Sequence, residues 1–82
     1  MKVPVGIIGV TGYAGQELLR ILSRHPGVAV RYLASLRARR PRRLGDLLPE
    51  FARRTGLTVR PFRVQEAAAR CDLLFLALPN GE

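Results

Sequence analysis

The segment Leu73–Leu78 is the feature that most constrains the fold of this 82-residue chain. It reads Leu-Leu-Phe-Leu-Ala-Leu, so a strand there carries no polar side chain on either face. A sheet with one solvated face needs alternating apolar and polar residues, whereas a parallel sheet covered by helices on both faces tolerates uniformly apolar strands. We therefore expect an α/β protein in which this strand is covered on both sides.

The rest of the chain alternates between short apolar runs and helical patterns. Three further runs have strand length: Val3–Ile8, Val28–Ala34 and Leu57–Arg60. Helical patterns separate them: one places Ala14, Leu18, Ile21 and Leu22 on one apolar face before His25-Pro26-Gly27, and shorter ones lie within 44–55 and 65–70. Right-handed crossovers then predict the strand order 3-2-1-4. The sequence predicts the first half of a Rossmann-type parallel sheet, with helices on both faces.

In that order the fourth strand lies at an edge of the sheet unless a fifth strand pairs with it. An exposed, flat, apolar edge strand promotes aggregation, and natural proteins avoid it. The chain also ends at residues 79–82, in the loop where a dinucleotide-binding fold would continue. We therefore expect residues 1–82 to be the N-terminal part of a dinucleotide-binding domain, with the substrate and catalytic domain absent from this chain.

The segment between the first strand and the first helix reads Gly-Val-Thr-Gly-Tyr-Ala-Gly over residues 9–15. At such a junction, unpaired backbone N–H groups and the positive end of the helix dipole attract a phosphate without any lysine. We expect Gly9 to permit the tight turn, Gly12 to let the backbone approach a pyrophosphate, and Gly15 to let the helix pack closely. Thr11 adds a hydroxyl that can donate to a phosphate oxygen. The spacing G-x-x-G-x-x-G in this context predicts a dinucleotide site.

The end of the second strand indicates which dinucleotide is bound. Enzymes that use NAD place an Asp or Glu about 20 residues beyond the glycines, bonded to the ribose 2′-hydroxyl. This chain has Ser35 and Arg37 there, and no acid before Asp46. A hydroxyl and a guanidinium bind a 2′-phosphate that a carboxylate would repel. We therefore predict NADP(H), with Ser35 and Arg37 at its 2′-phosphate.

Positive charge is concentrated in the same region. The net charge is +8, and five arginines crowd into residues 37–43: Arg37, Arg39, Arg40, Arg42 and Arg43. Such a patch indicates an anionic partner. We expect Arg39 to assist Arg37 and the last three to be solvated. The alternative is a basic module that binds nucleic acid, which the absence of aromatic residues within the run disfavours.

The rest of the sequence offers few candidates for other functional sites. The single cysteine, Cys71, excludes an internal disulfide and a multi-cysteine metal site, and without a nearby histidine it is expected to be a structural thiol. Asn80 follows the last strand, where it either lines the nicotinamide end or forms a turn. No apolar run approaches the roughly 18–20 residues that span a bilayer, and there is no secretory signal, so a cytoplasmic location is expected. We assign no catalytic and no metal-binding residue.

Several longer segments carry a family resemblance: Gly-Val-Thr-Gly-Tyr-Ala-Gly-Gln-Glu-Leu-Leu-Arg-Ile-Leu over 9–22, His25-Pro26, Ser35 with Arg37, Pro49, and Cys-Asp-Leu-Leu-Phe-Leu-Ala-Leu-Pro-Asn-Gly over 71–81. In order and spacing they resemble the N-terminus of N-acetyl-γ-glutamyl-phosphate reductases, within the semialdehyde dehydrogenase superfamily. The resemblance covers essentially the whole chain. It departs from the family in its denser arginines and in Pro79-Asn80-Gly81, where the family usually has Pro-His-Gly.

The resemblance implies NADPH-dependent reduction of an acyl phosphate to an aldehyde in arginine biosynthesis, by a homo-oligomer. In that family a cysteine thiolate forms a thioester, hydride from the nicotinamide releases the semialdehyde, and a histidine acts as acid and base. That cysteine and histidine belong to a later domain, so residues 1–82 alone are expected to be inactive. The cofactor-binding residues are assigned as Gly9, Thr11, Gly12, Tyr13, Ala14, Gly15, Ser35, Arg37 and Pro79.

Related enzymes remain alternatives at this stage. The acetylglutamyl substrate is favoured but not fixed, and the aminoadipyl phosphate of lysine biosynthesis stays an alternative, because residues that select the acyl chain lie elsewhere. Tyr13 and His25-Pro26 argue against aspartate-semialdehyde dehydrogenase. An NADP-binding reductase of the extended short-chain type is disfavoured by the Leu-Ala-Leu-Pro-Asn-Gly ending over 76–81.

Overall fold

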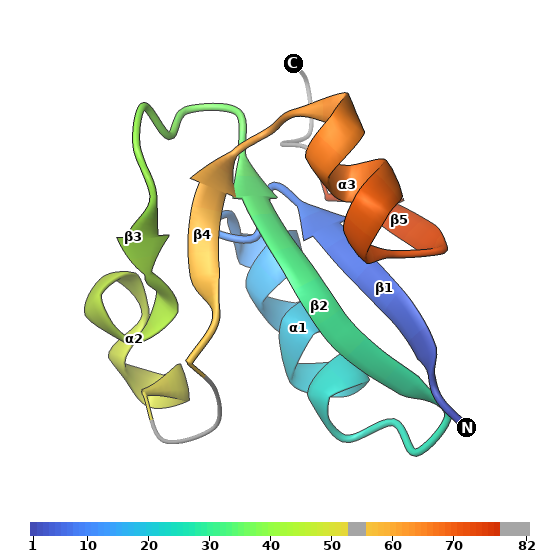
Figure 1. The fold of residues 1–82 in the computed structure, drawn as a ribbon. Coiled ribbons are helices and arrows are strands. Elements are labelled where there is room, and N and C mark those ends of the chain that lie inside the picture. The colour runs from blue at the N-terminus through green and yellow to red at the C-terminus, as the bar shows by residue number, and fades with distance from the viewer. Residues whose placement is uncertain (53–55, 78–82) are drawn as a thin grey trace.

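A computed structural model describes residues 1–52 and 56–77 of the chain. Strands and helices alternate along it (Figure 1). In chain order the elements are β1 (Val3–Ile8), α1 (Tyr13–Ser23), β2 (Val28–Ser35), β3 (Arg42–Arg43), α2 (Leu44–Leu47), the 3₁₀ turn η1 (Pro49–Phe51), β4 (Thr58–Pro61), α3 (Val64–Arg70) and β5 (Leu73–Leu76). The longest helix of the described residues, α1 with 11 residues, is far too short to cross a bilayer.

The sheet has the order β3-β4-β2-β1-β5. Its four parallel strands, β4, β2, β1 and β5, confirm the predicted order 3-2-1-4. The prediction was wrong in detail at one edge, because the segment expected to be a solvated arginine loop contains β3, which pairs antiparallel with β4. A two-residue strand of exposed arginines has no apolar alternation, so its pairing cannot be recognised from hydrophobic pattern.

The predicted helices on both faces are confirmed. One buried cluster joins Val5 and Ile7 of β1 to Leu19 of α1. The other joins Ile8 of β1 to Ala67 of α3. Because successive residues of β1 point to opposite faces, α1 and α3 cover opposite sides of the sheet (Figure 1).

The face that α1 buries matches the predicted one only in part, since Leu22 is buried and Leu18 packs against the core as predicted. Gly15, Leu19 and Leu22 are buried, whereas Ala14 is exposed and Ile21 is 62% exposed. Close packing of Gly15 against the preceding turn sets the rotation of the helix, and this outweighs the apolar stripe that Ala14 and Ile21 suggested.

The last strand lies at the edge of the sheet, as the predicted order requires, but it is not covered on both faces. Leu73, Leu74 and Leu76 are 50%, 38% and 67% exposed, and β5 pairs only with β1 among the described residues. The described residues therefore leave part of the apolar surface of β5 exposed.

An irregularity in β2 changes which way its side chains point. Val5 pairs with Val30, but the next residue, Gly6, pairs with Tyr32, so Arg31 is an extra residue opposite β1. Before this bulge Val30 packs on the α1 side, and after it Leu33 does. The bulge thus shifts the alternation of β2 by one residue.

Candidate functional site

The turn between β1 and α1 lies at the carboxyl ends of the parallel strands, where open α/β sheets bind ligands. Gly9 has φ +91°, and a Cβ atom there would lie 2.4 Å from the carbonyl oxygen of Ala77. A side chain at this position is excluded by both conformation and space. The predicted role of Gly9 in the tight turn is confirmed.

Gly15 is required for a different reason. A Cβ atom on Gly15 would lie 2.1 Å from the carbonyl oxygen of Gly9 and 2.7 Å from the Cα atom of Val10. Close packing of α1 at Gly15 was predicted against the strand, and the structure places it against Gly9 and Val10, which directly follow β1. At Gly12, by contrast, the nearest atom would be the Gly9 oxygen at 3.6 Å, an ordinary contact. The fold itself does not require glycine at position 12.

Protein groups occupy some of the amides in this turn. The N–H groups of Gly9 and Val10 both donate to the Ala34 oxygen, at 2.8 and 3.3 Å, and that of Gly12 donates to the Gly9 oxygen at 3.1 Å. The expectation that the N–H groups at this junction are unpaired is therefore wrong for these three residues. The open donors lie in the first turn of α1: the N–H groups of Tyr13, Ala14 and Gly15 have no acceptor among the described residues.

Nothing in the first turn of α1 competes with an anion. The N-cap residue, Gly12, provides no side-chain cap, and the first turn holds no acidic residue. Unsatisfied N–H groups and the positive end of the helix dipole both favour negative charge there. Thr11 and Tyr13 are exposed beside this helix end, and Gln16 secures the turn by donating from its side-chain amide to the Thr11 oxygen at 2.9 Å.

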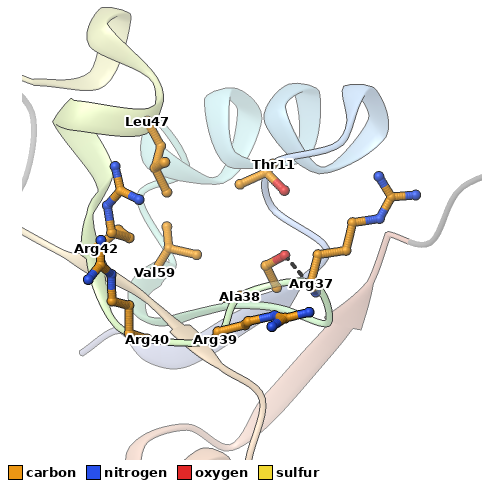
Figure 2. Close-up of a pocket in the computed structure, with 9 residues that line it drawn as sticks. Thr11, Arg37, Ala38, Arg39, Arg40, Arg42, Leu47 and Val59 are labelled. Carbon is orange, nitrogen blue, oxygen red and sulfur yellow. Dashed lines mark hydrogen bonds between the residues drawn. The ribbon is translucent and has the colours of Figure 1, made fainter.

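A cavity of about 320 Å³ opens next to the turn. Ser35, at the end of β2, is 94% buried in its wall, and Thr11 lines it from the β1–α1 turn. The Ser35 Oγ accepts a hydrogen bond from the Arg37 backbone N–H at 3.2 Å (Figure 2). The serine hydroxyl therefore keeps its own hydrogen for another acceptor. Leu47 and Val59 form the apolar part of the lining.

Four of the five clustered arginines line this cavity: Arg37, Arg39, Arg40 and Arg42. All four are exposed. Arg40 and Arg42, which were expected to be solvated, also contribute to the cavity, which the sequence did not indicate. Figure 2 shows Arg40 and Arg42 on the side of Leu47, and Arg37 extending away from them past Thr11. Arg43 lines a separate cavity together with Asp46. In the described part of the chain, no carboxylate lines the cavity that Ser35 and Thr11 share.

Cys71 has the structural role expected of it. Its thiol is buried and donates to the Ala67 oxygen at 3.1 Å. Burial, and to a lesser degree the neighbouring Asp72 carboxylate, raise the pKa of the Cys71 thiol above its usual 9.0. A thiol that stays protonated is a poor nucleophile. No group of residues suited to a metal ion occurs within residues 1–52 and 56–77.

The structure brings most of the predicted site residues into one region. Gly9, Thr11, Gly12, Tyr13, Ala14 and Gly15 form the turn and first helical residues, and Thr11 meets Ser35 and Arg37 at the cavity. Pro79 and Asn80 lie outside the described residues. The sequence missed Ala38, Leu47 and Val59 as lining residues, because small and aliphatic side chains carry no motif.

Comparison with known proteins agrees with this geometry. Residues 4–82 match the family described as "Semialdehyde dehydrogenase, NAD binding domain". Relatives named N-acetyl-gamma-glutamyl-phosphate reductase are 46% identical in Synechocystis sp. and Cyanothece sp., over 98% of this chain, and 44% identical in Wolinella succinogenes, over 96%. The chain spans 22–23% of the length of these relatives.

The site combines a strand-to-helix junction that has open amides with a neighbouring cavity. A nicotinamide dinucleotide is the cofactor that this family description names in its NAD-binding domain. With a match over nearly its entire length, this chain belongs to the semialdehyde dehydrogenase family and represents its NAD-binding domain.

Proposed function

We propose that residues 1–82 are the N-terminal, cofactor-binding part of an NADPH-dependent N-acetyl-γ-glutamyl-phosphate reductase of arginine biosynthesis. The observation that carries this proposal is the junction of β1 and α1, where open amides adjoin a cation-lined cavity. Relatives that carry this name match almost the whole chain. The substrate in the full-length enzyme is then an acyl phosphate, and the enzyme a cytoplasmic homo-oligomer.

The residues present fit a dinucleotide. The N–H groups at the start of α1 suit the pyrophosphate, because they have no protein acceptor and no acidic neighbour in that turn. When bound, the cofactor supplies the hydride that reduces the acyl group. The role of this chain is to bind and orient it. Cys71 is not proposed as the nucleophile, because it is buried and its thiol stays protonated.

The phosphorylated form, NADP(H), is proposed over NAD(H) on the basis of the cavity. Ser35 presents a buried hydroxyl with an unused hydrogen, and Arg37 follows two residues later. Within residues 1–52 and 56–77, no carboxylate lines this cavity to hold a ribose 2′-hydroxyl, since Asp46, on α2, contributes to a different cavity. A guanidinium and a hydroxyl bind phosphate well.

Replacing Arg37 with alanine in the full-length protein tests the choice of cofactor. The Kd for NADPH should rise by about tenfold, since hydrogen bonds to charged groups are worth about 1.5–3 kcal/mol, while the Kd for NADH changes little. Arg24→Ala is the matched control, because Arg24 is exposed at the other end of α1. Equal losses for both nucleotides would remove the assignment to the 2′-phosphate.

A further inference from the structure

Among the four arginines that line the cavity, Arg42 is the one that lies in a strand, β3. It lies on β3, where it pairs with Val59 of β4, and Val59 is itself buried in the cavity lining. The end of β3 is fixed as well: the N–H of Leu44 donates to the Leu57 oxygen at 3.0 Å, and Leu44 is fully buried. The backbone of Arg42 is therefore held by the pairing with β4 and by the hydrogen bond of Leu44 two residues later.

Arg42 also lies across the cavity from the residues already assigned to the cofactor. Figure 2 shows it beside Leu47, with Thr11 and Arg37 at the opposite end. One wall comes from the β1–α1 turn and the residues that follow β2, and the other comes from β3, which lies beyond β4 at the edge of the sheet.

The positive charge there is not compensated. Among the described residues, four arginines and no carboxylate line the cavity, and Arg42 forms no ion pair. Like charges at one cavity repel each other, and a bound anion relieves that repulsion. Arg43, the next residue on the same strand, lines a cavity with Asp46 instead, as expected when successive strand residues point to opposite sides.

We propose that Arg42 is a specificity-determining residue for the 2′-phosphorylated dinucleotide, supplying positive charge from the wall of the cavity opposite Arg37. This inference rests on the proposed function and extends it from the end of β2 to β3. It assigns a role in ligand selection to a residue that has no place in the glycine motif or at the end of β2.

The test compares Arg42→Gln with Arg43→Gln in the full-length protein, using NADPH and NADH as probes and isothermal titration as readout. Arg42→Gln should raise the Kd for NADPH by about fivefold, in the range of partly exposed ion pairs, and leave NADH unaffected. Arg42→Lys should retain most of the preference, because the charge is kept. Arg43→Gln should change neither Kd.

A thermal unfolding scan of the ligand-free protein accompanies the titrations. Arg42→Gln should unfold at the same or a higher temperature than wild type, so that weaker NADPH binding is not a consequence of lost stability. If Arg42→Gln and Arg43→Gln behave alike while Arg37→Ala loses the preference for NADPH, the role of Arg42 is overturned and the proposed function stands. If the wild-type protein binds neither nucleotide, the proposed function fails and this inference fails with it.

Discussion

The β1–α1 turn and the arginine segment border the same cavity, but different forces shape them. In the turn, Gly9 and Gly15 are required because any Cβ atom would overlap backbone atoms 2.4 and 2.1 Å away. In the segment 37–43, the arginine side chains are exposed and no described carboxylate pairs with them. Short-range sterics determine the first region, whereas long-range charge dominates the second.

This contrast separates two ways in which a site can fail. A side chain at Gly9 or Gly15 should unfold the site, since the atoms it would overlap belong to the backbone and not to a flexible side chain that can move aside. A change in the arginine segment should leave the fold in place and alter what binds. Salt should distinguish them too, because charge interactions at exposed positions are screened and steric overlaps are not.

The largest effect is expected from Gly15→Ala. The new methyl group would meet the Gly9 oxygen at 2.1 Å, so α1 must shift away from the turn. We expect the free energy of unfolding to fall by about 3 kcal/mol, at low and high salt alike. Urea denaturation at two salt concentrations measures it. A loss below about 1 kcal/mol would contradict the steric account of the turn.

Gly12→Ala sharpens the comparison within the turn itself. Its Cβ atom would lie 3.6 Å from the nearest protein atom, and Gly12 has φ −79° and ψ 169°, which alanine adopts freely. Stability should fall by less than about 1 kcal/mol, the usual scale for a changed N-cap. If the backbone at Gly12 approaches a pyrophosphate, NADPH and NADH should both bind about tenfold more weakly. Unchanged binding of both would show that this glycine has no role in binding.

The smallest effect concerns salt and the ligand-free protein. Raising sodium chloride from about 0.05 to about 0.5 M should increase the unfolding temperature by about 2 °C, because it screens the repulsion among the cavity arginines. In the double variant Arg40→Gln, Arg42→Gln this salt dependence should diminish. Calorimetry of both proteins provides the comparison, and identical salt responses would show that these arginines do not repel each other measurably.

Much of this architecture was predictable because it depends on local pattern. The runs at 3–8 and 28–34, the glycine spacing and the stop at His25-Pro26-Gly27 correctly predicted β1, β2, α1 and their junction. The rotation of α1 was not predictable, because a tertiary contact of Gly15 overrides the stripe that contains Ile21. The pairing of β3 was missed for a related reason: it depends on the partner strand and not on its own two residues.

The order of residues along the chain accounts for the glycine turn, the parallel strands and the presence of Ser35 and Arg37 at one strand end. Which way Ser35 points is decided by the folded sheet. Strict alternation from Val28 and Val30 would direct Ser35 to the α3 side, but the extra residue Arg31 shifts the register, and Ser35 joins Val59 at the cavity. The physical reason is the two-residue period of a strand, in which one inserted residue reverses the direction of every side chain that follows.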